Sequence, residues 1–275
     1  MIIGNKEFNH TNKTYIMGIL NVTPDSFSDG GSYNEVDRAL KRTGQMIEEG
    51  ADIIDIGAES TRPGHTVISA EEELERLIPV LTKIKKEYDI PVSIDTYKAG
   101  TAREAIRNGA DLINDIWGLQ YDNGEMAAVI ADNNKPCVLM HNRNEAVYDS
   151  LLDDMNRDLE KTLQIARTAG IQDDRIILDP GIGFGKTYEH NLSVLNNLSY
   201  FNQCGYPMLL GCSRKSVIGN ALNLPVDERL EGTLVTTILA AQAGYAFVRV
   251  HDIKENKRAL EMYFAIENME NHERI

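Results

Sequence analysis

Short apolar runs alternate with longer amphipathic stretches along the chain from residue 15 to near its end. The runs are rich in Ile, Val and Leu, which is typical of strands that are buried on both faces. They lie at residues 15–20, 53–56, 92–94, 112–114, 137–140, 176–178, 208–210 and 247–250. We predict a strand at each of these positions.

Amphipathic helices are predicted between and after these strands. Leu74, Leu77, Ile78, Leu81 and Ile84, for example, fall on one face of a helix. Several patterns end at a glycine, the residue that most readily adopts the left-handed conformation found at helix ends. These glycines are Gly50, Gly109, Gly170 and Gly244. The predicted helices lie near residues 35–49, 70–88, 98–108, 124–133, 151–169, 188–203, 227–243 and 254–268.

The alternation of strand and helix indicates a parallel sheet in a protein of the α/β class. About eight strand–helix pairs in about 260 residues fit a single (β/α)8 TIM barrel. An open doubly wound sheet is the competing fold, but it would favour a Gly-rich phosphate loop after the first strand, and Asn-Val-Thr-Pro-Asp at residues 21–25 is not one. We expect residues 1–13 to form a short hairpin or cap over the barrel bottom, and residues 14–275 to form the barrel domain.

The net charge of the chain limits the kinds of molecule that it is expected to bind. Its 28 Lys and Arg residues and 42 Asp and Glu residues give a formal net charge of −14, which argues against nucleic acid or an anionic membrane. The three cysteines form no C-x-x-C motif, which suits a reducing compartment. The sequence shows neither a signal peptide nor an apolar run of the roughly 20 residues that span a bilayer. We therefore expect a cytoplasmic protein in which any anion is bound by a local basic cluster.

Polar or ionisable residues follow every predicted strand. In a barrel, the C-terminal ends of the strands converge on one rim, where catalytic groups lie. Asp and Asn also occur there as helix caps, which would account for Asp111 and Asp115, but repetition at every strand favours a functional rim. The rim residues are Asn21, Asp55, Glu59, Ser60, Thr61, Arg62, Asp95, Asn114, Asp115, His141, Asn142, Arg143, Asp179, Ser213, Arg214, Lys215, Arg249 and His251.

Two kinds of chemistry are represented on this rim. Asp95, Asn114 and Asp179, with Lys215 beside them, suit a flat heterocycle that offers several N–H donors and a carbonyl. Burying two such carboxylates without a partner would be costly, so their burial would itself imply a ligand.

A second, cationic set suits a phosphate or diphosphate. It comprises Arg249 and His251, which stand two residues apart and so face the same way if the strand continues, and the loop at residues 60–62. Asn21 could add an oxygen ligand to a Mg²⁺ ion that keeps most of its shell as water and phosphate oxygens.

The segment at residues 21–34 is longer than an ordinary strand-to-helix loop. Its residues 21–31 contain an Asn, two carboxylates, hydroxyl groups and Phe27. A solvated Asp-Gly turn is the alternative, but long loops of this composition usually serve as lids or binding loops. We predict that residues 24–31 form a flap.

Five segments of the chain together resemble the dihydropteroate synthases. They are Met-Gly-Ile-Leu-Asn-Val-Thr-Pro-Asp-Ser-Phe-Ser-Asp-Gly-Gly at residues 17–31, Gly-Ala-Glu-Ser-Thr-Arg-Pro-Gly at 57–64, Asp-Pro-Gly-Ile-Gly-Phe-Gly-Lys at 179–186, Ser-Arg-Lys-Ser at 213–216 and Arg-Val-His-Asp at 249–252. The resemblance covers essentially the whole chain. It implies a transferase of folate biosynthesis, a target of sulfonamide drugs and usually a homodimer. Such enzymes join 4-aminobenzoate to 6-hydroxymethyl-7,8-dihydropterin diphosphate and release diphosphate.

The resemblance also implies a role for individual residues. Pterin would be bound by Asp95, Asn114, Met140, Asp179, Phe184 and Lys215. Diphosphate would be bound by Asn21, Thr61, Arg249 and His251, with Asn21 as the Mg²⁺ ligand. 4-Aminobenzoate would be bound by Phe27, Ser28, Thr61, Arg62, Pro63, Phe184, Lys215 and Ser216, with Asp29 nearby. The residues expected to act in catalysis are Asp95, Asp29, Lys215, Arg249 and His251.

An S_N1-like path follows from the same resemblance, with diphosphate leaving before the amine attacks. Loops 21–34 and 58–68 would close over the site to exclude water. Three other functions stay open at this point. They are a methyltransferase that uses a methylated folate, a Schiff-base aldolase that uses Lys215, and a barrel that binds pterin without catalysis.

Overall fold

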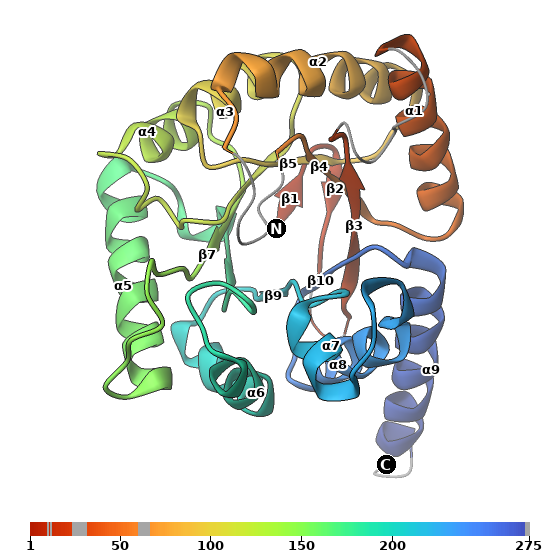
Figure 1. Cartoon of the computed structure of the whole chain (residues 1–275), viewed down its shortest axis with the longest axis vertical. Coiled ribbons are helices and arrows are strands. Elements are labelled where there is room, and N and C mark those ends of the chain that lie inside the picture. The colour runs from red at the N-terminus through yellow and green to blue at the C-terminus, as the bar shows by residue number, and fades with distance from the viewer. Residues whose placement is uncertain (10, 12, 24–31, 60–66, 273–275) are drawn as a thin grey trace.

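A computed structural model describes residues 1–9, 11, 13–23, 32–59 and 67–272. Its centre is a sheet of eight parallel strands in the order β8-β7-β6-β5-β4-β3-β10-β9, surrounded by helices (Figure 1). A parallel bridge between Leu178 and Met208 joins the two edge strands and closes the barrel. The strands are β3 (Tyr15–Asn21), β4 (Ile53–Gly57), β5 (Val92–Asp95), β6 (Leu112–Asp115), β7 (Cys137–Met140), β8 (Ile176–Asp179), β9 (Leu209–Leu210) and β10 (Phe247–Val250).

The predicted barrel and its eight strands are confirmed, with strand ends shifted by about a residue. Most predicted helices are confirmed as well, and Gly50, Gly109, Gly170 and Gly244 all have positive φ at helix ends. The helices are α1 (Ser32–Glu48), α2 (Ala70–Glu87), α3 (Ala99–Arg107), α4 (Glu125–Asp132), α5 (Leu151–Ala169), α6 (Tyr188–Asn196), α7 (Ser216–Leu222), α8 (Leu230–Gln242) and α9 (Ile253–His272).

The structure differs from the predicted helices in three places. The helix expected at 188–203 divides into α6 and the 3-10 helix η3 (Leu198–Cys204), and the one expected at 227–243 begins only at Leu230, after η4 (Val226–Glu228). Helix α7 was not predicted, because its seven residues are too few to show a periodic pattern. Asn223, with a φ of 55°, ends α7 in the left-handed conformation.

Alternate side chains of each strand point into the barrel or outward against the helices. Outward side chains such as Ile16, Ile54 and Leu139 belong to one large apolar cluster with the helices. Inward side chains at the lower end, including Met17 and Val138, form a second cluster. Because side chains alternate along a strand, the next inward positions toward the C-terminal ends lie at the barrel mouth.

The N-terminal hairpin closes the lower end of the barrel. Strands β1 (Ile2–Ile3) and β2 (Lys6–Glu7) pair antiparallel. Phe8 packs against Tyr15 and Phe247, with ring centroids 4.9 and 5.6 Å apart, and Ile3 is buried in the same cluster. This is the hairpin expected from residues 1–13, and it leaves the opposite end of the barrel as the place for a site. In the part of the chain that the structure describes, every helix is too short or too polar to cross a bilayer.

Candidate active site

Four neighbouring strands place one residue each in a single row at the barrel mouth. Asn21 pairs in register with Gly57, Gly57 with Asp95, and Asp95 with Asn114. A Cβ atom added at Gly57 would lie 3.6 Å from Asn21 Oδ1 and 3.8 Å from Asp95 Oδ2. Glycine at this position therefore keeps open the space between the predicted metal ligand and the predicted pterin carboxylate.

Arg249 connects this row to the residues below it. Its Nε lies 2.6 Å from Asp55 Oδ2 and its Nη2 lies 2.6 Å from Asp95 Oδ2. Asn114 Nδ2 donates to Asp55 Oδ2 over 3.3 Å. Asp55, one of the predicted rim residues, thus contacts both Arg249 and Asn114. The predicted pterin and cationic sets are joined at Arg249 rather than separate.

Some buried oxygens of this network lack a hydrogen-bond partner among the described residues. They are Asp55 Oδ1, Asp95 Oδ1 and Ser93 Oγ. Leaving such a group unsatisfied costs about 1–3 kcal/mol, so an orphaned acceptor at the barrel mouth points to a donor from a ligand. Asp95 Oδ1 is the one that belongs to the row at the mouth.

Burial sets the protonation of the carboxyl groups at this floor. It raises the pKa of Asp95 to about 7, the nearby Arg249 guanidinium acts in the opposite direction, and Asp55 adds to the rise. Burial likewise raises the pKa of Asp179, with Lys215 opposing. It lowers the pKa of Lys215, which the Asp179 carboxylate partly offsets. A ligand that donates hydrogen bonds to these carboxyl groups would favour their ionised forms.

Asp179, Lys215 and Phe184 lie together on the next part of the rim. Asp179 Oδ1 accepts a hydrogen bond of 2.7 Å from the Gly181 N–H. Lys215 Nζ donates to the Ile182 carbonyl and lies 4.6 Å from the centroid of the Phe184 ring. A Cβ atom at Gly211 would be 3.4 Å from Asp179 Oδ2 and 4.0 Å from Lys215 Nζ, so both groups lie close to that glycine.

An apolar wall stands beside these polar groups. Met140 is buried with Tyr97 and Ile116, and Trp117 and Phe184 pack against them. Met140 and Phe184 were predicted for this wall. Tyr97 and Ile116 were not, although each follows a strand-end residue of the rim, and that position was the available signal.

His251 lies just past the end of β10 and is fixed by the loop after β9. Its Nδ1 is 3.0 Å from Ser213 Oγ, and its backbone N–H donates to the same hydroxyl over 3.2 Å. Arg42 Nη2 donates to the His251 carbonyl over 3.3 Å. Because Ser213 Oγ accepts from the backbone, its own hydrogen can be donated to the imidazole. Ser216 is the first residue of α7 and is exposed.

Several predicted residues lie outside the described part of the chain. They are Phe27, Ser28, Asp29, Thr61, Arg62 and Pro63. The structure therefore describes the predicted pterin residues and three of the four predicted diphosphate residues, and much of the predicted 4-aminobenzoate set remains a sequence prediction.

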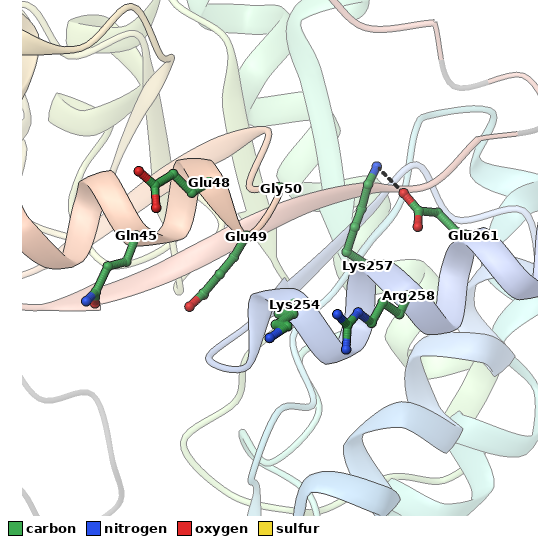
Figure 2. Close-up of a pocket in the computed structure, with 8 residues that line it drawn as sticks. All are labelled: Gln45, Glu48, Glu49, Gly50, Lys254, Lys257, Arg258 and Glu261. Carbon is green, nitrogen blue, oxygen red and sulfur yellow. Dashed lines mark ion pairs between the residues drawn. The ribbon is translucent and has the colours of Figure 1, made fainter.

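A cavity of about 580 Å³ elsewhere on the surface is distinct from this rim. It lies between α1 and α9, with Glu48 and Glu49 on one side and Lys254, Lys257 and Arg258 on the other (Figure 2). Lys257 pairs with Glu261 over 3.8 Å within α9. None of the predicted site residues lines it.

Comparison with known proteins finds relatives that match most of the chain. The family described as pterin binding enzyme matches residues 17–251. A dihydropteroate synthase from Clostridium beijerinckii is 58% identical over 263 residues, which cover 95% of this chain and 97% of that relative.

Two solved structures resemble the chain with a TM-score of 0.90. One is a dihydropteroate synthase from Clostridium difficile in the presence of pteroic acid, 49% identical, covering 92% of this chain and 96% of that one. The other is a Yersinia pestis dihydropteroate synthase in a sulfonamide drug complex, 38% identical, covering 98% and 99%.

Proposed function

The chain belongs to the dihydropteroate synthase family of pterin-binding enzymes, and on that premise we propose how its rim residues bind the substrates and act. Members join 6-hydroxymethyl-7,8-dihydropterin diphosphate to 4-aminobenzoate and release diphosphate. One observation carries the assignment of the site: Asp95 has one oxygen on Arg249 and its other oxygen buried without a partner.

The pterin ring lies on the floor formed by Asp95, Asn114 and Asp179. Asp95 Oδ1 accepts an N–H of the ring, and Asp179 accepts the remaining N–H groups of its amino-oxo edge. Lys215 donates toward the ring carbonyl, and Met140 and Phe184 enclose the ring between apolar faces. The pteroic acid in the Clostridium difficile structure contains the same ring system, which supports a pterin as the occupant.

Diphosphate is bound at the other end of the row, by His251 and Arg249 together with the predicted Thr61. A magnesium ion fits there on chemical grounds, because Asn21 directs an amide oxygen to the mouth beside Gly57. Among the described residues no group of three His, Cys, Asp or Glu side chains could hold a metal, so the ion would take its other ligands from diphosphate and water. Bound in this way, it would neutralise charge on the leaving group.

Bond breaking precedes bond making in the proposed reaction. The C–O bond at the hydroxymethyl carbon breaks, and diphosphate leaves with the electron pair. Asp95, as a carboxylate, stabilises the positive charge that spreads over the pterin ring, while Arg249 and His251 stabilise the departing anion. The neutral amine of 4-aminobenzoate then forms the C–N bond and loses its proton to solvent. This weak nucleophile needs positioning more than deprotonation.

The second substrate is placed next to Lys215, Ser216 and Phe184. Lys215 and the α7 N-terminus offer positive charge to its carboxylate. Phe27, Ser28, Asp29, Arg62 and Pro63 complete this subsite in the proposal. Sulfonamides would compete at the same place, as the drug complex of the Yersinia pestis relative suggests.

We also infer a homodimer in the cytosol. Val235 and Leu239 on α8, and Met262 and Ile266 on α9, are large apolar side chains exposed one helical turn apart. Helices α8 and α9 pack against each other, so a partner could cover both pairs. All three cysteines are free thiols, which suits a reducing compartment.

Product analysis tests this function against the alternatives. Purified protein is incubated with the pterin diphosphate, with and without 4-aminobenzoate, and diphosphate and dihydropteroate are quantified. A synthase produces both in equal amounts when the amine is present. Binding of the pterin with no release would favour a non-catalytic barrel, methyl transfer from a methylated folate would favour a methyltransferase, and a borohydride-trapped adduct on Lys215 would favour an aldolase.

A further inference from the structure

Lys186 is a half-buried cation that the proposed reaction does not use. It stands at the end of the β8–α6 loop, in the segment Asp-Pro-Gly-Ile-Gly-Phe-Gly-Lys. Its Nζ lies 2.9 Å from the Gly181 carbonyl, 3.0 Å from the Phe184 carbonyl and 2.9 Å from His141 Nδ1. An ammonium group has three N–H donors, so all three are used.

The acceptors belong to the part of the loop that shapes the pterin floor. Gly181 donates its N–H to Asp179 Oδ1, and Phe184 forms the apolar wall. The ammonium group of Lys186 therefore lies behind the loop and binds it at both of these points. These two hydrogen bonds fix the distance between the Asp179 carboxylate and the Phe184 ring.

The same loop lies directly on the segment that follows β7. A Cβ atom at Gly181 would be 2.0 Å from the His141 carbonyl oxygen, and one at Gly185 would be 2.5 Å from that of Arg143. Both glycines have positive φ. Tyr148 Oη adds a hydrogen bond of 2.7 Å to the Gly185 carbonyl. The loop is thus held by two sets of contacts. Its glycines pack against residues 141–143, and its carbonyl groups accept hydrogen bonds from Lys186 and Tyr148.

His141 connects Lys186 to helix α5. Its Nδ1 accepts from Lys186, so its Nε2 carries the hydrogen and faces Asp158 Oδ2 at 3.3 Å. Burial lowers the pKa of His141 to about 4, so the ring is neutral. Asp158 also receives Arg143 Nε at 2.6 Å and Lys161 Nζ at 2.8 Å.

A charge in such surroundings is expensive to keep. The three partners of Lys186 are two carbonyl groups and a neutral imidazole, and burial lowers the pKa of Lys186 to about 7. A methionine of similar length could fill the same space without that desolvation cost. The charge is therefore better explained by its geometric effect on the loop than by stability.

We propose that Lys186 is a positioning residue for the pterin substrate: it fixes the β8–α6 loop so that Asp179 and Phe184 are held at the spacing of the pterin ring. The inference rests on the proposed function, because it takes the pterin as the ligand of that loop. Lys186 itself touches no substrate.

Steady-state kinetics of Lys186→Met and Lys161→Met test the proposal. Both changes remove an ammonium group from the Asp158 network, but only Lys186 contacts the loop. We expect Lys186→Met to raise the KM for the pterin diphosphate tenfold or more, with a less than threefold fall in kcat. Lys161→Met should leave both constants within twofold of the wild type.

Tyr148→Phe provides a milder change of the same loop in case Lys186→Met does not fold. Loss of its bond to the Gly185 carbonyl should raise the same KM about two- to threefold. A merely structural role predicts lower melting temperatures with wild-type KM values, and that result in whichever of these two variants folds would overturn the proposal.

A binding measurement separates this proposal from the proposed function. The Kd of pteroic acid is determined by titration calorimetry for the wild type and the same variants. If the wild type released no diphosphate but Lys186→Met still weakened pteroic acid tenfold, the proposed reaction would fail and the positioning role would stand. Equal Kd values in wild type and Lys186→Met would overturn the positioning role whatever the activity.

Discussion

Arg249 is the residue at which the floor and the leaving-group side of the site meet. Its guanidinium contacts Asp55 and Asp95 at 2.6 Å each, while its strand neighbour His251 faces the loop after β9. The position of Arg249 at a strand end was evident from the sequence. Its pairing with Asp55 was not, because the two residues are 194 positions apart in the sequence and only the closing of the barrel brings them together.

Loss of Arg249 should destabilise the fold in a pH-dependent way. In Arg249→Met the two carboxyl groups remain buried without their cation, and breaking a buried pair costs about 3–5 kcal/mol. Loss of the guanidinium removes the charge that most lowers the pKa of Asp95, so this pKa rises further and the folded variant keeps a proton at a pH where the folded wild type has lost it. The deficit relative to wild type should therefore grow from pH 5 to pH 8.

Urea denaturation at both pH values measures this deficit. The exposed Arg103→Met is the control and should change the free energy of unfolding by less than about 0.5 kcal/mol at either pH. A loss below about 1 kcal/mol for Arg249→Met at pH 8 would refute the pairing.

The affinity for pterin should depend on the protonation of Asp95. Only the ionised carboxylate accepts the ring N–H. Burial raises the pKa of Asp95 to about 7, so near pH 7 about half of the ligand-free protein carries a protonated Asp95. Affinity should rise about tenfold from pH 6 toward pH 7.5 and then level off. Calorimetric titration with pteroic acid measures it, and Asp95→Asn should bind weakly with a flatter profile. A wild-type profile that falls over this range would contradict the assigned role.

At the scale of elements, regular strands and long helices were predictable, and the connections were not. A buried parallel strand can be recognised from a run of apolar residues, and a helix of four or five turns from apolar residues that recur every three or four positions. Helix α7 and the break between α6 and η3 have no such pattern, since they depend on how the chain packs around the rim. The loop between Asp179 and Lys186 was recognised by its residues, but the contact of its glycines with residues 141–143 emerges only from the fold.

Gly181→Ala tests that contact against a matched change at Gly170. Both residues have positive φ, at 69° and 91°, so alanine in either costs about 1 kcal/mol of backbone strain. A methyl group at Gly170 meets nothing within 4 Å, whereas at Gly181 it would be 2.0 Å from the His141 carbonyl oxygen. We expect a larger loss of unfolding free energy for Gly181→Ala, together with a higher KM for the pterin diphosphate. Equal losses and unchanged KM values in both variants would show that the loop does not need this close approach.

At the scale of the whole molecule, the acidic chain brings several positive charges to the barrel mouth and to the loops around it. Arg249, Lys215 and Lys186 all lie at strand ends or in the loops after them. The hairpin covers the opposite end of the barrel, so these charges and the predicted site share the mouth. The net charge of −14 was readable from composition, but the convergence of these cations follows from closing the sheet into a barrel.

Subunit association should depend on the apolar faces of α8 and α9. A Val235→Asp, Leu239→Asp double variant places two charges on the exposed apolar stripe and should convert the proposed dimer to a monomer. Sedimentation velocity measures the change. Val147→Asp, an equally exposed valine in the loop after β7, is the control and should remain dimeric. A wild type that sediments as a monomer would overturn the dimer.

The kcat/KM of Asp95→Asn for the pterin diphosphate tests the central claim most directly. This change keeps the size of the side chain and removes the charge that binds the ring and stabilises its cation, with Asp132→Asn on the exposed end of α4 as the control. The account predicts a fall of at least about 100-fold for Asp95→Asn, corresponding to about 3 kcal/mol of transition-state stabilisation, and no change for Asp132→Asn. A near-wild-type kcat/KM in Asp95→Asn would contradict it.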